Sequence, residues 1–194
     1  MIKGSSRRRS EHSVDPQFLD RWSARAMSGE ALSEAELLSL FEAARWAPSS
    51  ANFQPWRFLY VRRESDFWPA FLELLVPGNR VWAERAGALV VVISRLHFDD
   101  QRACITHSYD TGAAWQSLAL QASLNGIVAH GIQGFDYERA RRVLRVPAQF
   151  AVEAMIVLGK PGALAELPED YRQRETPSDR RPLAQTICEG PFSF

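Results

Sequence analysis

Residues 44–61, ARWAPSSANFQPWRFLYV, place two hydroxyls and two amides between Pro48 and Pro55, with Trp56 directly after the second proline. A proline fixes its own φ and disfavours helical geometry in the residue before it. The stretch therefore predicts a stiff, extended loop between a helix and a strand. Stiff polar loops on a rigid scaffold are common positions for ligand-binding groups, so we expect this loop to bind a ligand.

The composition limits the class of protein. With 194 residues, 46% of them hydrophobic, the chain can form one domain with a sizeable core. Lys plus Arg and Asp plus Glu both total 23, which gives no support for nucleic acid or an anionic membrane as a partner. The longest wholly apolar run, residues 88–93, is too short to span a bilayer. We expect a soluble, cytoplasmic protein.

The cysteines and histidines do not form a metal-binding pattern. Cys104 and Cys188 make no CxxC motif, and the four histidines have no zinc-ligand spacing. Two cysteines are also too few for a disulfide framework, so a reducing compartment is expected. The sequence predicts no metal site.

The order of predicted elements favours a layered α/β or α+β structure. Residues 1–16 are polar and basic, which predicts a flexible arm, followed by a single domain over residues 17–194. The Arg7–Arg9 run is expected in solvent, with an anion-binding patch as the less favoured alternative. Four helices are predicted: one from the Ser33–Glu36 capping box to before Pro48, one from Asp66 to Pro77, one over 109–125, and one that begins after the cap Asp136. Four strands are predicted: 57–62, 89–94, a short strand from 127, and 154–158. The helix over 109–125 is rich in small residues, so it lies either in the core or at a dimer seam.

One short stretch predicts an anion site. If residues 21–25 (RWSAR) are extended, alternate side chains share a face, and Arg21, Ser23 and Arg25 would present two guanidiniums and a hydroxyl together. Such a group suits a phosphate monoester. Arg180 and Arg181 form a second basic pair in the tail. Since neither GxGxxG nor GxxxxGK[ST] occurs, any bound phosphate is expected to be held by side chains.

Seven blocks occur in this order along the chain: RWSAR, AARWAPSSANFQPWRF, GNRVWAERAGALVVV, DTGAAWQSLALQASLNG, GIQGFD, MIVLGKPG and SDRRPL. Together they resemble the FMN-dependent nitroreductase superfamily over about residues 17–190. The resemblance implies an α+β sandwich with a mixed central sheet flanked by helices. It also implies an intertwined homodimer, with FMN at the subunit interface and the C-terminal tail packed on the partner.

The resemblance assigns cofactor-binding roles position by position. It implies that Arg21, Ser23, Arg25 and Arg180 bind the FMN phosphate. The loop residues Pro48, Ser49, Ser50 and Asn52 would cover the flavin of the other subunit. Asn79 would hydrogen-bond the pyrimidine end of the ring, and Gln133 and Gly134 would lie near flavin N5. Trp82 and Ser178 stand where the family often has lysine, and Gln133 where it often has glutamate.

The implied activity is that of an NAD(P)H-dependent FMN oxidoreductase. NAD(P)H would reduce bound FMN, which would then reduce a small organic acceptor, a nitroaromatic, a quinone or a similar compound, by a ping-pong mechanism. No side chain is assigned as catalytic, since the chemistry belongs to the cofactor. Two alternatives stay open: an FMN-dependent desaturase or oxidase of a specific metabolite, and a flavin-binding protein without turnover.

Overall fold

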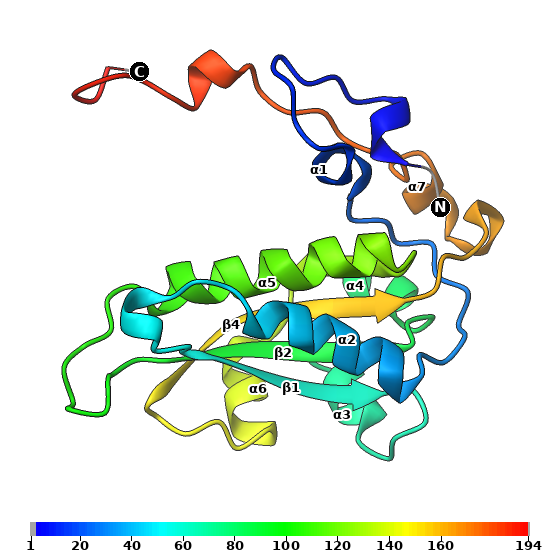
Figure 1. The fold of residues 1–194 in the computed structure, drawn as a ribbon. Coiled ribbons are helices and arrows are strands. Elements are labelled where there is room, and N and C mark those ends of the chain that lie inside the picture. The colour runs from blue at the N-terminus through cyan, green and yellow to red at the C-terminus, as the bar shows by residue number, and fades with distance from the viewer. Residues whose placement is uncertain (1–2, 194) are drawn as a thin grey trace.

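The structure is a computed structural model and describes residues 3–193. Its centre is a four-stranded sheet with strand order β1-β2-β4-β3 (Figure 1). The strands are β1 (Trp56–Arg62), β2 (Ala88–Arg95), β3 (Val128–Ile132) and β4 (Phe150–Gly159). The chain has the predicted α+β class, and the strands predicted over 57–62 and 89–94 lie within one residue of the observed bounds at each end.

The sheet is antiparallel at every pairing that the structure describes, so the prediction of a mixed sheet was wrong. β2 and β3 do run in the same direction, as strands joined by a helix usually do. The last strand, β4, lies between them and pairs antiparallel with both. Two parallel strands are thus present but are never neighbours.

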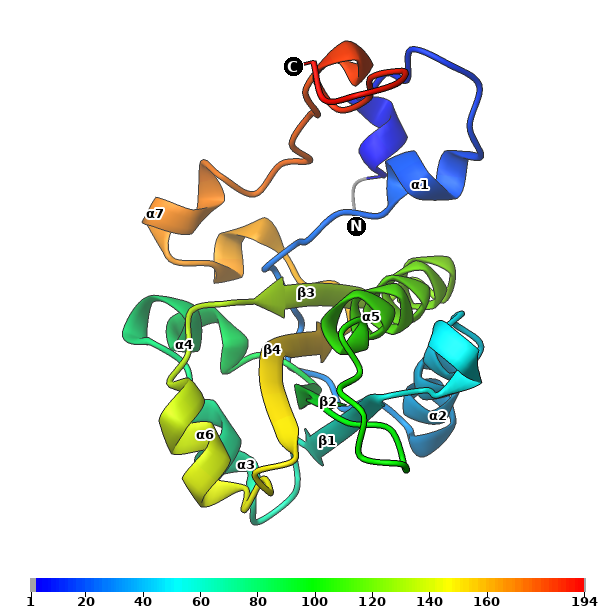
Figure 2. The same ribbon diagram turned by 90° about the vertical axis from the view of Figure 1, so that its left-hand side faces the viewer.

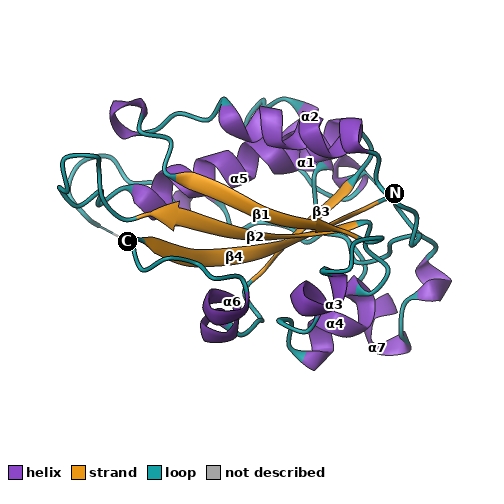
Figure 3. Ribbon diagram, turned by 90° about the horizontal axis from the view of Figure 1, so that it is seen from below, coloured by secondary structure: helices purple, strands orange, loops and turns teal. Residues whose placement is uncertain are grey.

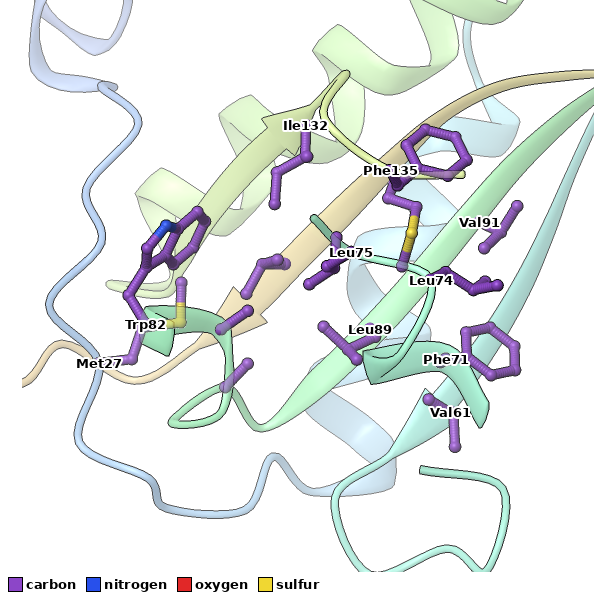
Figure 4. Close-up of a cluster of buried hydrophobic side chains, with 14 of the residues drawn as sticks. Met27, Val61, Phe71, Leu74, Leu75, Trp82, Leu89, Val91, Ile132 and Phe135 are labelled. Carbon is purple, nitrogen blue, oxygen red and sulfur yellow. The ribbon is translucent and has the colours of Figure 1, made fainter. Parts of the chain in front are cut away.

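Helices cover both faces of the sheet. Figure 3 shows α2 (Glu34–Arg45) and α5 (His107–Leu124) along one face, and α3 (Trp68–Leu72), α4 (Pro77–Ala83) and α6 (Tyr137–Val143) along the other. β2 is buried at every position except its last, which explains its continuous run of apolar residues. Its alternate side chains enter two cores. Leu89 and Val91 pack with Trp82 (Figure 4), whereas Val90 packs with Leu40 and Leu118.

Local capping contacts form at the predicted helix ends. The Ser33 hydroxyl accepts from the Glu36 N–H at 3.2 Å, and the Ser33 N–H donates to the Glu36 carboxylate at 2.7 Å, which confirms the capping box. Asp136 caps α6 by accepting from the Arg139 N–H at 2.8 Å. Gly126 follows α5 with φ of +70°, as a left-handed cap requires.

The helix predicted from Asp66 to Pro77 was wrong in its extent. The structure forms the short helix α3, and Pro77 begins α4 instead of ending a helix. Proline is well suited to the first turn because the N–H that it lacks would have no partner there. A proline therefore marks a helix boundary without telling on which side the helix lies.

The two ends of the chain lie side by side, away from the sheet (Figures 1 and 2). The N-terminal part contains the 3-10 helix Gly4–Ser6 and α1 (Pro16–Asp20); the tail contains Leu164–Glu166, α7 (Glu169–Arg172) and Leu183–Gln185. The flexibility of residues 1–16 stays a prediction. Within the Arg7–Arg9 run, however, Arg8 is only 6% exposed, so the prediction of a solvated run was wrong for Arg8.

No helix in the described part of the chain is long and apolar enough to cross a membrane. The same residues contain no group of three or more His, Cys, Asp or Glu side chains close enough to hold a metal ion.

Candidate functional site

The predicted phosphate-binding residues line one cavity. The stretch after α1 is extended: Trp22 and Ala24 are buried, and Arg21, Ser23 and Arg25 are half-buried on its other face. This is the alternation that the sequence predicted. A cavity of about 260 Å³ is lined by these residues and by others from both ends of the chain: Arg8, Arg21, Trp22, Ser23, Arg25, His130, Arg174, Thr176, Ser178 and Arg180. We call it the anion cavity.

The stretch is held in place by backbone contacts at its far end. The Glu175 carboxylate accepts from the N–H groups of Arg25 and Ala26 at 2.6 and 2.8 Å. Gly162 donates its N–H to the Ala26 carbonyl at 2.9 Å. Next to this contact, Met27 forms a bridge with Pro161, directly after β4. The end of the sheet therefore fixes the position of the arginines.

The cavity is strongly cationic. Burial is the main cause that lowers the pKa of Arg21 below its usual range, and the charges of Arg8 and Arg180 lower it further. The pKa of Arg8 is lowered in the same way, by burial first and by Arg180 second. Such shifts show guanidinium groups that repel one another in a partly desolvated place. An anion would relieve this repulsion.

His130 on β3 adds a neutral group to the cavity wall. Its Nδ1 lies 2.9 Å from the Ala24 carbonyl oxygen, which only accepts, so Nδ1 carries the proton and Nε2 is left as an acceptor. Its ring lies 4.8 Å from the ring of Trp82. Burial lowers the pKa of His130 to about 4, and the nearby charges of Arg25 and Arg21 add to this effect.

This pKa predicts a specific acid sensitivity. Between pH 6.5 and 4 the unfolded chain protonates His130 and the folded chain does not, so stability falls as the pH falls through this window. We expect His130 to account for about 2 to 3 kcal/mol of the unfolding free energy lost between pH 7.5 and 4.5. Urea unfolding at both pH values measures this loss in the wild type and in His130→Gln. An equal loss in both proteins would contradict the assignment.

A second group of predicted residues lies next to the anion cavity. The Asn79 side-chain amide donates to the Gly134 carbonyl at 3.0 Å, and the Val76 N–H donates to the same oxygen at 3.1 Å. A Cβ on Gly134 would lie 2.5 Å from the Asn79 amide nitrogen, so only glycine allows this approach. Gln133 directly precedes Gly134 in the loop after β3.

Two elements join this group to the anion cavity. α4 carries both Asn79 and Trp82, and the Trp82 ring lies near His130 and 5.9 Å from the Arg25 guanidinium carbon. β3 carries His130, three residues before Gln133, which corresponds to about 10 Å along a strand. The Trp82 indole nitrogen is buried and has no hydrogen-bond partner in the structure. Asn79, Gln133 and Gly134 therefore lie on the elements next to the anion cavity but do not line it.

The loop residues Pro48, Ser49, Ser50 and Asn52 lie elsewhere on this chain. The loop precedes Trp56, which pairs with Ser94 near the start of β4, whereas the anion cavity follows the end of β4. β4 has ten residues, so the two places are separated by about 30 Å of strand. Figure 1 shows the loop beyond the end of α2, on the side opposite to α7. A single chain does not bring the two groups together.

The loop is held in an unusual backbone conformation. Ala51, Asn52 and Gln54 have φ values of 50° to 53°, in the left-handed region that non-glycine residues rarely adopt. The Ser49 hydroxyl accepts from the Gln54 N–H at 3.0 Å. Asp110 accepts from the Ser50 N–H, also at 3.0 Å. Ser50–Asn52 form a short 3-10 helix, so the prediction of an extended loop was wrong for these residues, and the stiffness of the loop stays a prediction.

Sequence reasoning missed the roles of Asp110 and Arg8. The Asp110 carboxylate lies inside the first turn of α5 and accepts from the Ser50 N–H and from the Thr106 hydroxyl. For Arg8, the sequence offered an anion-binding patch over Arg7–Arg9 only as the less favoured alternative to a solvated run; Arg8 lines the anion cavity, whereas Arg7 and Arg9 are exposed. A carboxylate at the start of a long helix was the only signal for Asp110.

Comparisons with known proteins agree on one family. The model of the Nitroreductase family matches residues 19–160. A curated relative named NADH dehydrogenase, from Thermus thermophilus, is 29% identical, with 87% of this chain and 92% of the relative covered. Protein DrgA from Synechocystis is 27% identical, with 81% of this chain and 86% of the relative covered.

Two solved structures have a similar fold and carry FMN in their descriptions. One, described as an oxidoreductase containing FMN, is 46% identical with a TM-score of 0.95 and covers 99% of both chains. The other is a putative nitroreductase in complex with FMN from Desulfovibrio desulfuricans. It is 27% identical, has a TM-score of 0.72 and covers 95% of this chain and 100% of its own.

Proposed function

Because the chain belongs to the nitroreductase family, we propose that it is an oxidoreductase that binds FMN and uses NAD(P)H to reduce a small organic acceptor, such as a nitroaromatic or a quinone. One observation carries this proposal. The cationic anion cavity has His130 in its wall, and the His130 ring contacts Trp82 on α4, the helix that also carries Asn79 next to Gly134, so an anion-binding group and an amide group lie in adjacent parts of the fold.

The donor set fits the phosphate monoester of FMN. Five guanidiniums, those of Arg8, Arg21, Arg25, Arg174 and Arg180, line the cavity with three hydroxyls. Guanidinium groups bind phosphate with charge-assisted hydrogen bonds, often two at a time. Arg21, Ser23, Arg25 and Arg180 would hold the phosphate, as the resemblance implies. Asn79, Gln133 and Gly134 would lie along the ring.

We further propose a homodimer, in which Pro48, Ser49, Ser50 and Asn52 of one copy reach the site of the other. The separation of the loop from the anion cavity supports this arrangement. So do large apolar side chains around the loop, since Trp46 is 74% and Tyr109 82% exposed. The small residues of α5 were expected either in the core or at a dimer seam. Ala114 and Ala122 are buried in the core. Nothing lies within 4 Å of a Cβ built on Gly112, so this position is open for a second copy.

The side chains of this site bind and orient, and none is assigned as a catalytic acid, base or nucleophile. FMN, when bound, supplies the redox chemistry, by accepting a hydride from NAD(P)H and passing the electrons to the acceptor. A stiff loop would lower the ordering cost of binding a flat ring. Cys104 and Cys188 are free thiols, which supports a location in the reducing cytoplasm.

Reduction under anaerobic conditions tests the proposed activity. We expect NADH or NADPH to bleach the flavin absorbance of the FMN-loaded protein. Double-reciprocal plots with a quinone or a nitroaromatic should give parallel lines, because both substrates would use one site in turn. Intersecting lines would contradict a ping-pong mechanism. No bleaching with either nucleotide would favour the desaturase, oxidase or flavin-binding alternatives.

A further inference from the structure

The two ends of the described chain are joined by three specific contacts. The Arg7 guanidinium donates to the Thr176 hydroxyl at 3.0 Å, and the Leu183 N–H donates to the Glu11 carboxylate at 2.9 Å. Between them, Arg8 donates to the Ser178 carbonyl at 2.7 Å. We call residues 7–11 and 176–183 the terminal clasp. Both segments lie outside residues 19–160, which the family model matches.

Arg8 is the buried centre of the terminal clasp. Besides Ser178, its guanidinium donates to the carbonyls of Leu19 and Arg21 at 2.9 and 2.7 Å. It thus ties the arm, the tail and the start of the RWSAR stretch together at one point. Arginine is rarely so buried unless its charge is paired. The three carbonyls accept from its Nε and Nη1 groups and carry no net negative charge.

The charge of Arg8 faces other cations. Arg8, Arg21 and Arg180 line the anion cavity together; after burial, the charges of Arg8 and Arg180 lower the pKa of Arg21, and the charge of Arg180 lowers the pKa of Arg8. Asp179 offsets this only in part, because burial and Arg180 have the larger effects on Arg8. Closing the terminal clasp therefore concentrates positive charge, which favours opening unless an anion enters.

We propose that Arg8 is a further binding residue for the phosphate of the cofactor, and that phosphate binding and closure of the terminal clasp stabilise each other. The inference rests on the proposed function, since that function supplies the phosphate. The link is reciprocal: the anion favours the closed clasp, and the closed clasp raises affinity for the anion by the same factor.

Hydrogen exchange of the backbone, read by mass spectrometry, tests the link. In the full chain without cofactor we expect peptides covering residues 3–15 and 176–183 to exchange at least five times faster than in the chain loaded with FMN. Inorganic phosphate at millimolar concentration should slow the same peptides in part. Riboflavin, which has the ring but no phosphate, should not. Equal protection by FMN and riboflavin would overturn the link.

Affinity measurements separate phosphate binding from a merely structural role. Arg8→Gln should weaken FMN about ten-fold and leave riboflavin within two-fold, and Arg8→Lys should recover part of the loss. The matched control is Arg9→Gln, on the same arm, because the Arg9 side chain donates to the carbonyls of Ser5 and Arg8 on its own segment and does not line the anion cavity. This control should bind both ligands as the wild type does.

The binding results distinguish the role of Arg8 from the existence of the cofactor site. If Arg8→Gln binds FMN as tightly as the wild type while Arg21→Ala does not, the role of Arg8 is overturned and the cofactor site stands. If Arg8→Gln loses riboflavin as much as FMN, its role is structural and the inference is wrong. A wild type that binds neither ligand overturns both the inference and the proposed function.

Discussion

Replacing Arg21 or Arg25 by alanine is expected to weaken FMN binding about ten-fold to a hundred-fold and to leave riboflavin binding almost unchanged. A charge-assisted hydrogen bond contributes roughly 1.5 to 3 kcal/mol, and 1.4 kcal/mol corresponds to one decade in affinity. Arg180→Ala should lie at the low end, because Arg180 is exposed and solvent screens its charge. Quenching of flavin fluorescence measures both ligands.

Asn79 provides the control for this experiment. Since Asn79 is assigned to the ring, Asn79→Ala should weaken FMN and riboflavin to a similar degree. Arginine variants that lose riboflavin as badly as FMN would show that these residues serve folding. Variants that lose neither ligand would place the cofactor elsewhere.

A methyl group at position 162 is expected to cost about 3 kcal/mol of unfolding free energy or more. A Cβ on Gly162 would lie 2.4 Å from the carbonyl carbon and oxygen of Met27 and 2.7 Å from the Ser28 nitrogen. All three are backbone atoms of the stretch that carries Arg21 and Arg25, so relief requires that the whole stretch moves. Overpacking of this kind costs 1 to 3 kcal/mol or more.

Gly159→Ala is the matched control, because its Cβ would also approach Met27. The atoms that it meets belong to the flexible side chain, with sulfur at 2.8 Å, which can rotate away. We expect a cost of about 1 kcal/mol. Urea unfolding measures both variants. Equal unfolding free energies of Gly162→Ala and Gly159→Ala would show that the backbone at Met27 can move as easily as the Met27 side chain.

Local patterns predicted local structure well. The period of two in RWSAR placed Arg21, Ser23 and Arg25 on one face, and the burial of Trp22 and Ala24 confirms it. The capping box and the glycine cap likewise fixed helix ends through contacts between residues close in sequence. Both partners of such a contact lie within a few residues of each other, so one sequence is enough to predict the contact.

Long-range contacts could not be predicted in this way. The acceptors of Arg8 lie 11, 13 and 170 residues away, and all three are carbonyls, which every residue carries. The last strand, β4, lies between β2 and β3, so the strand order in the sheet does not follow the order of strands in the chain. The separation of the Ser49–Asn52 loop from the arginines is equally a property of the folded sheet.

The anion cavity also dictates when a newly made chain can first bind its cofactor. Its walls come from residues 8, 21–25, 130 and 174–180, so a chain on the ribosome that has completed the whole sheet still lacks Arg174, Ser178 and Arg180. Domains fold from the N-terminus as they emerge. The sheet and its helices would fold first, with the half-buried Arg21 and Arg25 in place, and the tail would complete the cavity afterwards. Under the proposed function, loading with flavin is therefore a late event in biosynthesis that follows synthesis of the tail.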